Sequence, residues 1–146
     1  MKVRKGFITN SSSSIFIIKN RTEKELTICE FVEDNLDLLD DFLKEYGSYK
    51  DDNKKFNYDR MREDAKNRLE KARDLIEECK KEGRSLDELD EIEKEYVNNA
   101  IFPAGEKVEV EYGDDDGDVL GAIFDYMLRD SGASKSFEWY FKEFNR

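Results

Sequence analysis

The amino-acid sequence predicts an α+β domain, in which a small, mostly antiparallel sheet carries packed helices and an inserted antiparallel helical hairpin. Three observations favour this fold class. Segments rich in β-branched and aromatic residues lie near both ends of the chain, apolar residues spaced by three and four dominate its middle, and Gly or Pro separates these segments. The length of 146 residues suits a single domain, 1–146, with residues 54–100 as the helical hairpin.

The first two strands are expected on either side of a serine-rich turn, as an N-terminal hairpin. Phe7 and Ile8 lie in a β-compatible segment, residues 2–9, and residues 15–18 form the continuous apolar run IFII. A run of this kind suits a strand that is covered on both faces. Asn10 and the four serines that follow it favour a turn, which predicts a buried hairpin at the centre of the sheet.

The next segment is predicted to be one long helix. Thr22 and Glu25 match a capping box, and Gly47 ends the pattern. Between them, apolar residues recur at spacings of three and four, namely Leu26, Cys29, Val32, Leu36, Leu39, Leu43 and Tyr46. The opposite side carries the candidate partner-binding residues Asp34, Asp37, Asp40, Asp41 and Glu45. A run of charges on a helix is more often a solvated face, so these acids are a hypothesis.

Two further helices are predicted to form the helical hairpin. The first spans about residues 58–81 and has a narrow apolar stripe, Met61, Ala65, Leu69, Ala72, Leu75, Ile76 and Cys79. Gly83 ends it, and Ser85 with Glu88 offers a second capping box before an apolar face of Leu89, Ile92, Tyr96 and Ala100. Helices joined by so short a turn lie antiparallel. A narrow apolar stripe on a helix can contact only one partner, so we expect the two helices to pack on each other and to project from the domain as an arm. The alternative is that both helices pack wholly on the sheet.

The C-terminal part returns to strand, helix and strand. Apolar Val108, Val110 and Tyr112 alternate with Glu109 and Glu111, which predicts a strand with one buried and one exposed face. A helix capped by Asp118 follows, with the stripe Leu120, Ile123, Phe124, Met127 and Leu128. A last strand is predicted from Phe137, Trp139 and Phe141, which alternate with Glu138, Tyr140 and Lys142. Residues 137–144 also fit a helical spacing.

The charge is large and unevenly distributed. The net charge is −11, with five basic and no acidic residues in 1–21, but three basic against eleven acidic in 22–53 and six against seventeen in 85–146. Such a chain is repelled by phosphate backbones and anionic membranes, so we expect neither as a direct partner. A protein with a basic surface is the expected partner.

The sequence carries no complete catalytic or cofactor signature. It has no histidine, which excludes Ser-His-Asp and Cys-His arrangements and most zinc sites. The two cysteines, Cys29 and Cys79, follow no recognisable secretory signal and fit reduced thiols in a cytoplasm. We therefore expect no cofactor and favour a non-enzymatic protein, with catalysis at the serine-rich segment as an alternative that stays open.

The acidic turn before the last helix is the one place where a metal ion is considered. Asp114, Asp116 and Asp118 are weak candidates for a hard cation. The EF-hand spacing fails, because alignment on Gly117 puts Ile123 where a bidentate Glu belongs. No metal site is therefore predicted.

The serine-rich segment offers an alternative, anion-binding interpretation. Small hydroxyls, loop N–H groups and nearby basic residues could surround a phosphate, and the candidates are Arg4, Lys5, Asn10, Ser11, Ser12, Ser13 and Ser14. The segment lacks the glycine and lysine spacing of a nucleotide-binding loop, since no second glycine follows Gly6 before Gly47. A structural turn is therefore favoured over phosphate or nucleotide binding.

The same segment carries a resemblance. Its string Lys2-x-Arg4-x-Gly6-Phe7-x-Thr9-Asn10-Ser11-Ser12-Ser13-Ser14-x-Phe16-Ile17 resembles the opening shared by many small, uncharacterised proteins of bacteriophages and their low-GC bacterial hosts. In that group the serine run is one residue longer, so Ile15 departs from the pattern. The resemblance implies a phage or mobile-element setting, hence a host cytoplasm, and no activity.

The sequence thus favours a small acidic phage-type accessory protein that acts by protein–protein interaction. Its acidic helices could inhibit a basic, nucleic-acid-binding host protein, as an anti-defence protein would. Two alternatives stay open. One is ligand binding or catalysis at Asn10 to Ser14, and the other is a structural component that forms a homo-oligomer through the helical arm.

Overall fold

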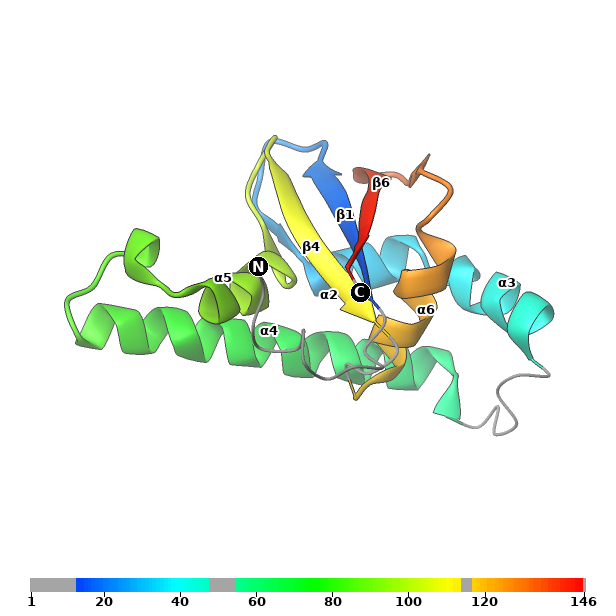
Figure 1. The fold of residues 1–146 in the computed structure, drawn as a ribbon, viewed down its shortest axis with the longest axis horizontal. Helices are drawn as coiled ribbons and strands as arrows, with labels where there is room; N and C mark the ends of the chain where they lie inside the picture. The colour runs from blue at the N-terminus through cyan, green and yellow to red at the C-terminus, as the bar shows by residue number, and fades with distance from the viewer. Residues whose placement is uncertain (1–12, 48–54, 114–116, 146) are drawn as a thin grey trace.

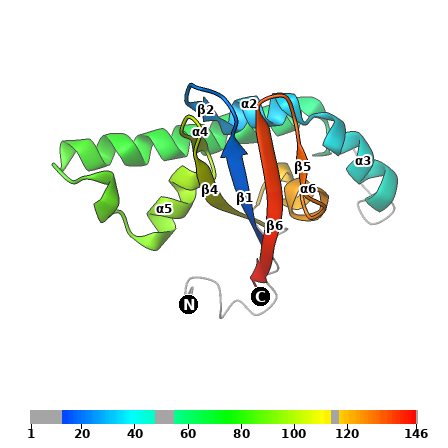
Figure 2. The ribbon, with the colours of Figure 1, turned by 90° about the horizontal axis from the view of Figure 1, so that it is seen from above.

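The computed structural model describes residues 13–47, 55–113 and 117–145. Its main sheet is four-stranded and antiparallel, in the order β4-β1-β6-β5, and a second sheet pairs β2 with β3. Three helices, α2, α4 and α6, lie against one face of the main sheet (Figure 1), and the strands run side by side when that sheet is seen from above (Figure 2). The predicted α+β class with an antiparallel sheet is confirmed.

Strand β1 (Ser13–Asn20) is the central strand. It pairs along its length with β4 (Lys107–Gly113) on one edge and with β6 (Phe137–Asn145) on the other. Both edges are thereby occupied, so β1 cannot also pair with an N-terminal strand as the predicted hairpin requires. The two C-terminal strands take those places instead, and the predicted partner strand, residues 2–9, lies outside the described residues.

The helix-covered face of the sheet holds the main core. Side chains of alternating β1 residues point to that face, and Phe16 and Ile18 are fully buried there. They meet α2 (Ile28–Asp34), the first half of α4 (Tyr58–Lys81) and α6 (Val119–Met127). Phe31 of α2 lies at the centre, where its ring packs edge-on or tilted against Phe102, Phe124, Phe137 and Trp139.

The predicted long helix begins later than expected and is divided. Its capping box is formed by Thr27 and Glu30, not by Thr22 and Glu25. Thr22 instead donates to the buried side chain of Asn20 through its backbone N–H and its hydroxyl, at 2.8 and 2.7 Å. The residues between form β2 (Leu26–Thr27), which pairs with β3 (Ile101–Phe102), and the helix breaks at Asn35 before α3 (Asp37–Tyr46).

The helical hairpin packs on the main core with one part and projects from it with the other. The first half of α4 contributes Met61, Ala65, Leu69 and Ala72 to the main core. The rest of α4 extends beyond the sheet, followed by the 3-10 turn η2 (Leu86–Glu88) and the antiparallel helix α5 (Glu91–Asn98) (Figure 1). In this projecting part Cys79 and Leu89 are buried outside the main core cluster.

The predicted apolar face of the second arm helix is only partly correct. Leu89 and Ala100 are buried, but Ile92 is 43% exposed and Tyr96 is 41% exposed. The capping box of Ser85 and Glu88 forms, yet it caps only η2, because Leu89 adopts an extended backbone and ends that turn. A separate capping box, Asp90 with Glu93, starts α5.

The C-terminal elements follow their patterns. Asp118 is the N-cap of α6, and residues 137–145 form β6, so the helical interpretation of that segment is wrong. The short strand β5 (Gly132–Ala133), which the sequence analysis missed, pairs with β6. In β4, Val110 and Tyr112 are buried as predicted, but Glu111 on the expected exposed face is only 3% exposed.

The outer edge of β4 is capped by a side chain. The amide nitrogen of Asn99, at the end of α5, donates to the backbone oxygen of Glu111, and the backbone N–H of Glu111 donates to the Asn99 amide oxygen, both at 3.1 Å. The amide therefore takes the place of a neighbouring strand at this residue. It also joins the arm to the sheet.

Replacement of Asn99 by alanine should destabilise the fold. The change removes both hydrogen bonds to a buried stretch of backbone, and we expect a loss of about 2–4 kcal/mol in the free energy of unfolding. Urea titration measures this loss. The control is Asn98→Ala, a neighbouring half-buried amide with no such pair of bonds, and equal stability of the two variants would contradict the capping role.

Candidate functional site

Helix α3 lies at one end of the molecule (Figure 1). Its inner side buries Leu39 and Phe42. The Phe42 ring lies within 5.4 to 6.1 Å, centre to centre, of the rings of Tyr46, Phe56 and Tyr126. Because this aromatic cluster packs α3 against α6 and against Phe56, just before α4, the outer side of α3 is a supported surface for its charged residues.

The outer side carries the acidic face of α3, defined as Asp37, Asp40, Asp41 and Glu45. All four residues are exposed, and their spacing of three and four places them on neighbouring turns. Asp40 accepts a hydrogen bond from the Tyr58 hydroxyl at 2.8 Å, which raises the pKa of Tyr58. No described basic residue forms an ion pair with these carboxylates, and the one basic residue of α3 is Lys44.

Asp34, the fifth acid of the predicted surface, has a structural position. It is half-buried and accepts hydrogen bonds from the Ser134 hydroxyl at 3.1 Å and from the Ser136 backbone N–H at 2.9 Å. These bonds hold the loop that joins β5 to β6. Asp34 therefore lies apart from the acidic face of α3.

Two of the predicted anion-binding serines lie inside the sheet. Ser13 and Ser14 are buried residues of β1, and successive residues of a strand point to opposite faces. Ser13 donates to the Glu111 carboxylate at 2.5 Å, and Ser14 donates to the Asp125 carboxylate at 2.6 Å. An anion on these hydroxyls would adjoin two buried carboxylates, an unfavourable position. The other candidates, Arg4, Lys5, Asn10, Ser11 and Ser12, lie outside the described residues.

Of the three candidate metal ligands, only Asp118 lies within the described residues. Asp114 and Asp116 lie outside the described residues. Asp118 accepts a hydrogen bond from the backbone N–H of Gly121 and forms a two-pronged ion pair with Arg68, at 2.6 and 2.8 Å. Among the described residues, no group of three His, Cys, Asp or Glu side chains is arranged to hold a metal ion.

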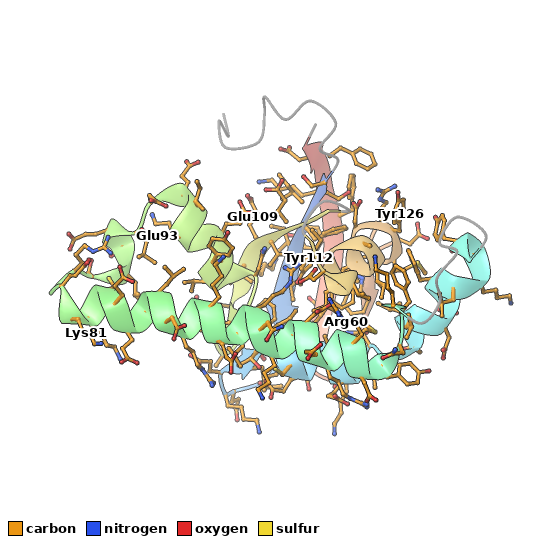
Figure 3. All side chains as sticks on the ribbon, turned by 90° about the horizontal axis from the view of Figure 1, so that it is seen from below. Arg60, Lys81, Glu93, Glu109, Tyr112 and Tyr126 are labelled. Carbon is orange, nitrogen blue, oxygen red and sulfur yellow. The ribbon has the colours of Figure 1, made fainter. Side chains whose placement is uncertain are left out.

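A polar network that was not predicted from the sequence joins α4 to α6. Asp64 is 3% exposed, accepts from the backbone N–H of Val119 at 2.8 Å and pairs with Arg60 at 3.1 Å. One turn further along α4, Arg68 binds Asp118 and lies 5.4 Å from the centre of the Tyr112 ring. The spacing of Arg60, Asp64 and Arg68 by four was the available signal, since it places all three on one side of α4. Figure 3 shows this helix crossing beneath the sheet, from Arg60 to Lys81 in the arm.

Burial of Asp64 has an electrostatic consequence. Loss of hydration raises the pKa of its carboxyl above the usual aspartate value, and the Val119 N–H and the two arginines oppose this effect. The carboxylate is therefore less stable in the folded protein than in water. The network orients α6, and the free-energy cost of burying the charged Asp64 carboxylate depends on pH.

No family model, curated protein or solved structure matches the chain. Within the described residues, no helix is long and apolar enough to cross a membrane. The acidic face of α3 is therefore defined by geometry and charge alone.

Substitution of Asp64 by asparagine should change the pH dependence of stability. Because the pKa of Asp64 is higher in the folded than in the unfolded chain, the folded state binds this proton more readily, and the wild-type protein loses stability as the pH rises through that interval. The Asp64→Asn variant lacks this loss. Urea titrations from about pH 4 to pH 7 measure it as the difference in unfolding free energy between the two proteins.

The matched control for this measurement is Asp74→Asn, an exposed carboxyl on the same helix. The difference in unfolding free energy between Asp64→Asn and wild type should change with pH more than the difference between this control and wild type does. An Asp64→Asn difference that changes no more than that of the control, or that changes in the opposite direction, would show that burial does not govern this carboxyl.

Proposed function

We propose that this protein acts by binding a protein partner with a basic surface through the acidic face of α3. The observation that carries the proposal is the presence of four exposed carboxylates on one helix, without an ion pair to any described basic residue. Ion pairs within the chain would otherwise neutralise such charges. These four are available to lysine and arginine side chains of another molecule.

The support beneath these charges favours recognition over non-specific attraction. The buried side chains Leu39 and Phe42 and the rings around them hold α3 in place. The helix that carries the carboxylates is therefore already ordered before a partner binds, which lowers the entropy cost of binding. Complementary charge speeds encounter and disfavours partners of the wrong sign. Exposed pairs of this kind are screened over about 8 Å at physiological salt, so the interaction weakens as salt increases.

The kind of partner follows from the same charge. A net charge of −11 repels nucleic acid, whereas proteins that bind nucleic acid present basic faces. Binding of the acidic face of α3 to such a face would occlude it. In the phage setting that the opening segment suggests, the basic face belongs to a host protein and the effect is inhibition.

The alternative of phosphate binding has less support. The hydroxyls of Ser13 and Ser14 are committed to the carboxylates of Glu111 and Asp125. A phosphate would have to displace these hydrogen bonds and lie beside two buried acids. We therefore favour the protein partner.

Reversal of charge on α3 should abolish capture of the partner. We suggest the triple variant Asp37→Lys, Asp41→Lys and Glu45→Lys, which retains Asp40 because of its bond to Tyr58. In affinity capture from host lysate followed by mass spectrometry, basic proteins retained by the wild type should fall roughly tenfold or more with this variant, and also at high salt.

The control carries the same change in net charge elsewhere, as Glu23→Lys, Glu106→Lys and Asp130→Lys, all exposed positions. Equal circular dichroism spectra verify that both variants fold. The proposal fails when no basic protein is recovered, or when the control loses the same proteins to the same extent.

A further inference from the structure

We propose that the outer part of the arm is a second docking surface, and that its occupant is a basic amphipathic helix of another protein. This arm surface is defined by the apolar residues Leu86, Ile92 and Tyr96 and by the acidic residues Asp87 and Glu91. It lies at the end of the molecule opposite to α3 (Figure 1), and it does not depend on the acidic face of α3.

Exposed apolar side chains concentrate in this segment. Of six large hydrophobic residues that are exposed within the described residues, three lie between 86 and 96, where Leu86 is 49% exposed, Ile92 43% and Tyr96 41%. Ile92 and Tyr96 are four residues apart on α5, so they share one side of that helix. A single exposed apolar residue is ordinary, but three in eleven residues indicate a contact surface.

The fold of the arm does not require these side chains to be apolar. The projecting part has its own buried pair, Cys79 and Leu89, and α5 is anchored at its C-terminal end by Val97 and Ala100, which belong to the main core or pack against it. Leu86, Ile92 and Tyr96 lie outside both groups. Their exposure therefore costs hydration free energy that a partner could recover.

The backbone that carries this surface is held by contacts within the chain. Gly83 takes a positive φ of 72° at the end of α4, and the Cys79 thiol lies 3.1 and 3.3 Å from the backbone oxygens of Arg84 and Ser85, where it donates a hydrogen bond. The capping box of Asp90 and Glu93 fixes the start of α5. A preformed surface loses little conformational entropy on binding.

Tyr96 is held by a cation. The Lys71 ammonium of α4 lies 4.0 Å from the centre of the Tyr96 ring, an attractive cation–π distance. Figure 3 shows α4 running alongside the segment that contains α5. Lys71 thus contacts the ring of Tyr96, which is still 41% exposed.

The surrounding charge identifies the chemistry of the occupant. Residues 82–96 contain seven acidic and two basic residues, and Lys71 of α4 adds one positive charge beside Tyr96, so acids still predominate around the surface. Glu88, Asp90 and Glu93 serve in capping boxes, whereas Asp87 and Glu91 are exposed and form no ion pair with any described residue. Apolar side chains bordered by carboxylates match a helix whose apolar residues are flanked by lysine or arginine. A second copy of this surface would bring like charges together.

A defined peptide tests the inference. The probe is a synthetic helical peptide with leucine along one face and lysine along the other, and its binding to the full chain is measured by fluorescence anisotropy. Control peptides replace lysine by glutamate, or leucine by glutamine. Binding should require both leucine and lysine, because the surface combines apolar residues with acids.

Two sets of variants locate the binding site. The double variant Leu86→Ser and Ile92→Ser should weaken binding by roughly tenfold or more, as removal of central apolar contacts does. Its control, Tyr140→Ser and Phe144→Ser, removes two exposed aromatic residues from the sheet and should bind as the wild type does. Thermal unfolding verifies that both variants remain folded.

The outcomes separate this inference from the proposed function. The α3 triple variant should bind the peptide no worse than the triple control with the same net charge, whether or not α3 proves to bind a protein. Unchanged binding by Leu86→Ser and Ile92→Ser overturns the inference, as does equal binding of the glutamate peptide. Light scattering that shows a wild-type dimer, absent in this double variant, would identify the occupant as a second copy and likewise overturn it.

Discussion

The structure depends on the hydrogen bonding of β1 along both of its edges. This strand joins β4 on one side and β6 on the other, so three segments far apart in the sequence form one antiparallel sheet. The sheet gives Phe16 and Ile18 a helix-covered face, on which α2, α4 and α6 pack around Phe31. Backbone groups in such a central strand have no other partner once water is excluded, which makes the pairing obligatory.

The same arrangement determines where charge is displayed. The helices α2, α4 and α6 pack on one face of the sheet, and the 24-residue helix α4 is longer than the sheet that it crosses, so part of it extends into the arm (Figure 1). α3 lies at the opposite end. Partly buried polar contacts, such as Arg68 with Asp118, orient these elements, whereas the carboxylates at the two ends remain exposed. The division explains how an acidic chain can hold a stable core and still present concentrated negative charge.

Several sequence predictions failed where two local signals compete. Both Thr22 with Glu25 and Thr27 with Glu30 match a capping box. The helix starts at Thr27 because Thr22 is hydrogen-bonded to Asn20 and because Leu26 and Thr27 pair with β3. The exposure of Ile92 and the burial of Glu111 have a related cause. Periodicity reports which residues share a side, but the partner that covers that side comes from elsewhere in the chain.

The features that depend on near neighbours could be predicted from the sequence. These include the long helix α4, the cap of α6 at Asp118, the alternation in β6, and the acids along α3, because each depends on contacts within a few residues. Other features follow from long-range contacts. These are the strands that flank β1, the hydrogen bond from Ser13 to Glu111 across 98 positions of sequence, and the bond of Asp34 to the loop before β6. Contacts of that range depend on the packing of the whole chain, and no local pattern encodes them.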